Sequence, residues 1–139
     1  MPERTASSQK LVLWIIWFAL VSSIVAYQLI LGHGIPHGSN VPETETSPIA
    51  AVAIGEIAAA CVIRWLLIPK THGAGKLLVL MIIGLALSES AEFFGLFLVP
   101  DNQPETKLAI WILSLLSALQ FMPVYAANHQ DKENAFHRS

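Results

Sequence analysis

Few residues in this sequence carry charge, and only one is a cysteine. Asp, Glu, Lys and Arg make up 13% of the 139 residues, while 54% are hydrophobic. Soluble domains are typically about 25% charged. The shortage of charge therefore argues against an ordinary soluble domain and predicts a membrane protein. The single cysteine, Cys61, excludes an intrachain disulfide, and its place in an apolar run predicts a buried, unreactive thiol.

Several functional signatures are also missing from the sequence. The formal net charge is only -2 and the basic residues are scattered singly, which argues against a nucleic-acid partner. We find no nucleophile motif, phosphate-binding loop or haem attachment site. The sequence therefore predicts neither an enzyme nor a bound cofactor.

Four apolar segments each approach the roughly 20 residues that a helix needs to cross a bilayer. Polar connections rich in Gly, Pro and Asn separate them, and the connections are short enough to make consecutive helices antiparallel. The predicted spans are 11–31, 49–68, 77–98 and 108–127. We therefore predict an all-α, polytopic membrane protein with a four-transmembrane-helix antiparallel bundle over residues 11–127. A cytoplasmic N-terminus (1–10) precedes it and a polar cytoplasmic tail (128–139) follows.

The distribution of basic residues predicts the orientation of these spans. On one side of the bilayer, the only Lys or Arg is Lys107. The other side carries all the rest, namely Arg4, Lys10, Arg64, Lys70, Lys76, Lys132 and Arg138. The positive-inside rule therefore places both termini in the cytoplasm. We expect an inner (plasma) membrane protein whose main contact is the lipid bilayer.

Three glutamates lie inside the predicted spans, Glu56 in the second and Glu89 and Glu92 in the third. At about 1.5 Å per residue, all three fall roughly 9 to 13 Å from the outer ends of their helices, so they share one layer. A charge at the bilayer centre costs about 2.5 to 3.5 kcal/mol on insertion scales, and such residues normally face a bundle interior and mark function.

Helical spacing relates these glutamates to rows of small residues. Glu89 and Glu92 are three residues apart and share one face of their helix. The third span carries a small-residue seam, which we define as Gly84, Ser88, Ala91 and Gly95. A similar stripe on the second span comprises Ala53, Glu56, Ala60 and Arg64. We predict that the two stripes pack together and that Glu56, Glu89, Glu92 and Ser88 form a water-poor proton- or cation-binding site.

Two functions remain open from these residues. In the first, the glutamates bind or relay protons or small cations. In the second, the protein is a structural or accessory subunit of a membrane complex, and protonated glutamates are hydrogen-bonding glue between helices. Small-residue seams allow close helix packing, so in either case we expect a homo-oligomer or an assembly with other membrane subunits.

The third span reads Gly-Leu-Ala-Leu from Gly84, then Glu89, then Gly-Leu from Gly95, and it follows a helix rich in small residues and a short basic connection. This hairpin resembles the proteolipid ring subunit of rotary ATP synthases, and the resemblance implies that Glu89 is the proton-exchanging carboxylate. Glu92 and the first and fourth spans have no counterpart in that family. The whole chain resembles small four-helix bacterial membrane proteins, which implies an architecture rather than an activity.

Other polar residues have simpler interpretations. His33 and His37, with glutamates nearby, offer ligands for zinc or copper, but Pro36 and the neighbouring glycines favour a solvated loop, so we predict no metal site. We expect Arg64 to reach the lipid headgroups. The polar residues predicted to form hydrogen bonds between helices are Gln28, Ser114 and Gln120.

Overall fold

The computed structural model describes residues 2–36 and 48–124, which fold into four α-helices. Two of these helices continue directly into short π-helical or 3-10 turns. No strand occurs within the described ranges, so the prediction of an all-α chain with four helices is confirmed. The elements are α1 (Pro2–Ile30), α2 (Pro48–Val62) with the π-helical and 3-10 turns η1 (Ile63–Leu67) and η2 (Ile68–Lys70), α3 (Ala74–Phe93) with the π-helical turn η3 (Phe94–Leu98), and α4 (Pro104–Leu119).

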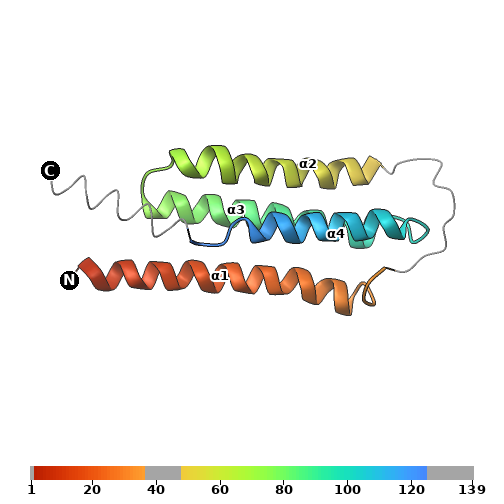
Figure 1. The fold of residues 1–139 in the computed structure, drawn as a ribbon, viewed down its shortest axis with the longest axis horizontal. Helices are drawn as coiled ribbons and strands as arrows, with labels where there is room; N and C mark the ends of the chain where they lie inside the picture. Colours follow the sequence, from red (N-terminus) through yellow and green to blue (C-terminus); the bar gives the residue numbers. More distant parts are fainter. Residues whose placement is uncertain (1, 37–47, 125–139) are drawn as a thin grey trace.

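The four helices lie with their axes nearly aligned, and consecutive helices run in opposite directions (Figure 1). α3 and α4 pack against each other, and each also contacts both α1 and α2. α3 and α4 therefore form the centre of the bundle, with α1 and α2 on its flanks.

Gly84 of α3 and Gly95 of η3 make room for two large side chains, Phe121 just after α4 and Ile110 within it. A Cβ atom added to Gly84 would lie 2.1 Å from Cζ of Phe121, and one added to Gly95 would lie 2.7 Å from Cγ2 of Ile110. Both distances are shorter than any ordinary carbon contact, so these side chains already occupy the space over the glycines. Between the two contacts, the hydroxyls of Ser88 and Ser117 lie 2.8 Å apart. The three contacts define one continuous antiparallel register.

This packing corrects the predicted partner of the small-residue seam. We predicted that the whole seam packs on α2. Ala91 does so, in a buried cluster with Ala50 and Ala53 of α2, whereas the nearest side chains to Ser88 and the two glycines come from α4 and from Phe121 just after it. The physical reason is that Phe and Ile side chains fill the space over the glycines better than a second row of small residues would.

Three helical stretches are long and apolar enough to cross a membrane. They are Lys10–Ile30, Pro48–Lys70 and Gly75–Leu98, with 21, 23 and 24 residues. α4 differs from the predicted span 108–127, because it begins at Pro104 and ends at Leu119 after 16 residues. That length corresponds to about 24 Å, shorter than the roughly 30 Å hydrocarbon core. Pro123, which cannot continue a helical hydrogen-bond ladder, follows shortly after its end.

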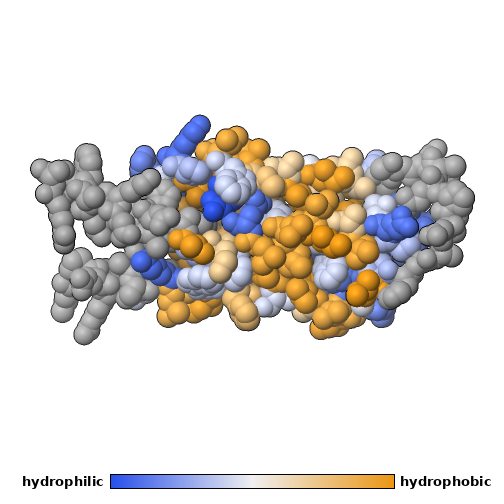
Figure 2. All heavy atoms as spheres, in the orientation of Figure 1, coloured by the Kyte–Doolittle hydropathy of each residue, from blue (hydrophilic) through white to orange (hydrophobic). Residues whose placement is uncertain are grey.

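The surface of the bundle agrees with a membrane environment. Hydrophobic residues dominate the middle of the face shown in Figure 2, and hydrophilic residues gather mainly toward its two ends. Large side chains such as Phe18, Ile54 and Leu116 are more than half exposed. Soluble monomers rarely expose continuous apolar surface of this kind, so the structure indicates a membrane protein.

The contact between Gly84 and Phe121 predicts a measurable cost for a single added methyl group. We expect Gly84→Ala to lower the free energy of unfolding by about 1 to 3 kcal/mol, because overpacking forces the Phe121 ring out of place. The control is Gly55→Ala on α2, where an added Cβ meets nothing within 4 Å. Thermal unfolding of both variants in the same detergent micelles checks this prediction. Equal stabilities of the two variants would contradict the close approach of α3 and α4.

Candidate functional site

Glu92 is the one buried charged residue in the part of the chain that the structure describes. Its side chain is 1% exposed, and neither carboxyl oxygen has a hydrogen-bond partner among the described residues. Nearly all buried polar side-chain atoms in proteins have at least one partner. A carboxyl group with both oxygens buried and unpartnered is therefore the first candidate for a functional group in this bundle.

Glu89 is held by α1. The hydroxyl of Ser23 lies 2.7 Å from Oε1 of Glu89 and also 2.7 Å from the carbonyl oxygen of Leu20. A hydroxyl has only one hydrogen to donate. Its single hydrogen is therefore shared between Oε1 of Glu89 and the carbonyl oxygen of Leu20. One turn further along these helices, the rings of Tyr27 and Phe93 pack with their centroids 4.9 Å apart.

Glu56 connects α2 to α3. The hydroxyl of Ser90 donates to Oε1 of Glu56 over 3.1 Å. The second carboxyl oxygen of Glu56 is buried and has no hydrogen-bond partner among the described residues. This contact places Glu56 beside residue 90 of α3, between the levels of Glu89 and Glu92.

The three carboxyl groups therefore lie in one layer but do not touch. Their levels on α3 span three residues, which is about 4.5 Å along the helix axis. No hydrogen bond or ion pair joins any two of them in the described parts of the chain. Glu89 accepts a hydrogen bond from Ser23 of α1, and Glu56 accepts one from Ser90 of α3. Glu92 is buried in the interior of the bundle. Sequence spacing located the layer, but it did not reveal the separate partners of each carboxyl group.

Ser88, the fourth predicted site residue, belongs to a chain of hydrogen bonds that leads away from Glu92. Its hydroxyl donates to the carbonyl of Gly84 over 3.0 Å. The side-chain amide of Gln120 donates to the hydroxyl of Ser117 over 3.3 Å, and Ser117 donates to Ser88 over 2.8 Å. Because the single hydrogen of Ser88 is already used, this hydroxyl cannot donate to the carboxyl group of Glu92.

Gln120 joins α4 to the end of α2. Its amide nitrogen also lies 3.4 Å from the sulfur of Cys61, and its amide oxygen accepts a hydrogen bond from Nε1 of Trp65 at 3.0 Å. Nε of Arg64 donates to the backbone carbonyl of Gln120 over 2.6 Å, and the Arg64 guanidinium stacks on Trp65. The predicted role of Gln120 as an interhelical hydrogen bonder is confirmed. Arg64 caps the end of α4, a contact that the sequence did not predict.

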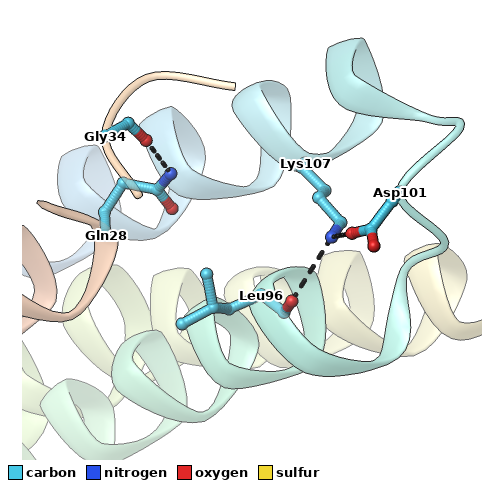
Figure 3. Close-up of polar contacts among 5 residues, drawn as sticks. All are labelled: Gln28, Gly34, Leu96, Asp101 and Lys107. Carbon is cyan, nitrogen blue, oxygen red and sulfur yellow. Dashed lines mark hydrogen bonds and ion pairs between the residues drawn. The ribbon is translucent and has the colours of Figure 1, made fainter. Parts of the chain in front are cut away.

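The opposite end of the bundle is closed by polar contacts of its own (Figure 3). Nζ of Lys107 forms an ion pair with Asp101 and lies 3.5 Å from the carbonyl oxygen of Leu96. The hydrogen bond from Lys107, together with its charge, holds the pKa of the exposed Asp101 carboxyl below its ordinary value. Gln28 donates to the carbonyl of Gly34, which lies in the loop after its own helix, over 2.7 Å. The structure therefore shows Gln28 bonding within its own segment and not between helices.

The histidine pair is only half described. His33 is exposed and has a positive φ of 55°, while His37 lies outside the described residues. Within the described ranges, no group of three or more His, Cys, Asp or Glu side chains is placed to hold a metal ion.

The sequence analysis missed three serines that form hydrogen bonds with the predicted site residues. Ser23, Ser90 and Ser117 bind the predicted site residues, and each lies within a helix that is otherwise mostly apolar. A systematic survey of hydroxyl groups in the apolar segments would have identified all three as candidates.

No protein-family model, curated protein or solved structure matches this chain. The likeness to the proteolipid ring subunit therefore rests only on the sequence of the third span, from Gly84 to Leu96, and on the helix and connection before it. That likeness assigns proton exchange to Glu89, whereas the buried carboxyl group without partners belongs to Glu92.

The two contacts of Ser23 predict how substitutions of Glu89 behave. We expect Glu89→Gln to change the free energy of unfolding by less than about 0.5 kcal/mol, because the amide oxygen of Gln can accept a hydrogen bond from Ser23 as the carboxyl oxygen does. Ser23→Ala, the matched change on α1, removes the donor and should cost about 0.5 to 1.5 kcal/mol. Thermal unfolding of both variants in the same detergent micelles checks this prediction. A Glu89→Gln variant less stable than Ser23→Ala would show that an amide cannot replace the carboxyl group in this contact.

Proposed function

We propose that this protein is an integral membrane protein whose carboxyl layer binds and relays protons, with Glu92 as its central group. The observation that carries the proposal is the burial of the Glu92 carboxyl group without any partner among the described residues. A charge at this position in a bilayer would cost about 2.5 to 3.5 kcal/mol or more. Lys107 pairs with Asp101 and not with Glu92, so it does not offset the cost of a charge on Glu92. Glu92 therefore rests in the protonated form and becomes charged only transiently.

The arrangement favours protons over metal ions as the bound species. A metal cation prefers several oxygen ligands that converge on one point. In this bundle the carboxyl groups of Glu56 and Glu89 turn to separate hydroxyls, on Ser90 and Ser23. A proton needs only one acceptor at a time and can pass between groups at neighbouring levels through small side-chain movements.

The proposed setting is a four-transmembrane-helix bundle in the inner membrane with both termini cytoplasmic. Lys10, Arg64, Lys70 and Lys76 belong to the end of the bundle where α2 ends and α3 begins, and Lys107 belongs to the other end. This asymmetry supports the orientation through the positive-inside rule. Partner helices are either a second copy or other membrane subunits. The exposed row of small residues Ala51, Gly55 and Ala59 on α2 is consistent with close helix packing.

A second candidate function is structural. The hydrogen bonds from Ser23 to Glu89 and from Ser90 to Glu56 each connect two helices. Protonated glutamates used in this way would stabilise an accessory subunit without moving protons. This candidate explains Glu56 and Glu89 well, but it gives no role to the unpartnered Glu92.

Proton flux into liposomes that contain the purified full chain distinguishes the two functions. We expect Glu92→Gln to lower the flux by roughly 10²-fold or more, as when a positioned proton-transfer group is removed. The control is Glu105→Gln, which neutralises an exposed acid in the first turn of α4 and should leave flux unchanged.

Two results would contradict the relay. Equal flux in Glu92→Gln and the parent protein would exclude Glu92 as the central group. If the parent protein shows no flux and substitutions of Glu56, Glu89 and Glu92 only lower its stability, the structural function is correct.

A further inference from the structure

The stretch of α3 that contains Glu92 faces the middle of α4. Ser88, one turn before Glu92, lies against Ser117. Gly95, three residues after Glu92, lies against Ile110. The two helices run antiparallel and rise equally per residue. Residues 89–94 of α3 and η3 therefore lie beside residues 111–116 of α4.

At this level α4 contributes two further buried polar atoms. Ser114 is fully buried, and its hydroxyl has no hydrogen-bond partner among the described residues. The same holds for the buried indole nitrogen Nε1 of Trp111. Ser114 shares the α3-facing side of α4 with Ile110 and Ser117, at helical spacings of four and three residues. With the two oxygens of Glu92, these are four buried polar atoms without a partner among the described residues, and the second carboxyl oxygen of Glu56 is a fifth in the same layer.

The chemistry of these groups selects the ligand. A buried water molecule typically makes two to four hydrogen bonds, roughly three on average. A carboxyl group, a hydroxyl and an indole N–H supply three partners of the required kinds. The indole N–H only donates, so it cannot bind a cation, and the set suits water better than a metal ion.

We propose that Glu92, Ser114 and Trp111 hold an ordered water molecule between α3 and α4, and that this water exchanges the proton of Glu92. The exchange rests on the proposed function. The water site itself depends only on the burial and register of the three residues.

The proton step uses only these groups. On release, the O–H bond of the Glu92 carboxylic acid breaks and a new O–H bond forms on the water, giving hydronium and a carboxylate. One of the three protons of the hydronium then returns to the carboxylate, which restores the acid and the water and completes the exchange. While it is charged, the carboxylate accepts a hydrogen bond from the water that Ser114 and Trp111 hold, and such charge-assisted bonds are stronger than neutral ones. Ser88 takes no part, because its hydrogen is donated to Gly84.

Infrared difference spectroscopy, triggered by a pH change in the full chain in lipid nanodiscs, tests this site. The carboxyl C=O band of Glu92 is assigned by its loss in Glu92→Gln. We expect an O–H stretching band from the bound water. This band should shift when the solvent is replaced by ¹⁸O-labelled water, and it should disappear in Ser114→Ala. The Glu92 C=O band should move to higher frequency in Ser114→Ala and in Trp111→Phe, because each variant removes a partner of the water that hydrogen-bonds the carboxyl group.

The control is Ser90→Ala, which removes a hydroxyl from the same layer that bonds Glu56 instead. This variant should leave both bands unchanged. An absent water band, or one that survives in Ser114→Ala, would overturn the water site even if liposomes show proton flux. A water band with the expected behaviour in a protein without flux would keep the site and overturn the proposed relay.

Discussion

The close approach of α3 and α4 over Gly84 and Gly95 determines where the polar groups in the bundle lie. The side chains of Ile110 in α4 and Phe121 just after it fill the space over the two glycines, and the hydroxyls of Ser88 and Ser117 meet between them. This register leaves Glu92 level with polar residues of α4 and out of contact with solvent. A side chain on either glycine would separate the helices and admit lipid or detergent to the carboxyl layer.

The three carboxyl groups of that layer differ in how their hydrogen-bonding needs are met. Glu89 and Glu56 each contact one hydroxyl from a neighbouring helix, so both contribute to packing whatever else they do. Glu92 has no such contact within the described ranges. A buried polar group without a partner destabilises a fold, and the bundle contains such a group in its acidic layer. That cost is most simply explained if Glu92 has a function that a fully bonded carboxyl group could not perform.

The architecture was predictable from the sequence because run length and polarity determine it directly. The long apolar segments became helices, and counting residues along them placed Glu56, Glu89 and Glu92 at one depth. The partner of the glycine seam was not predictable, since a row of small residues indicates a close neighbour without saying whether it brings Ala or Phe. The roles of Ser23 and Ser90 were missed for a different reason. Hydroxyls inside helices often bond their own backbone, so their presence alone does not imply an interhelical bond.

Reaction with a membrane-soluble carbodiimide would show whether Glu92 carries a proton in an apolar environment. Such reagents attack protonated carboxyl groups in apolar surroundings. Mass spectrometry of the digested protein, labelled in native membranes, would locate the adduct. We expect an adduct on Glu92 and none on Glu105, which is exposed on the first turn of α4. Labelling of Glu56 or Glu89 with Glu92 left unmodified would contradict the protonated state of Glu92.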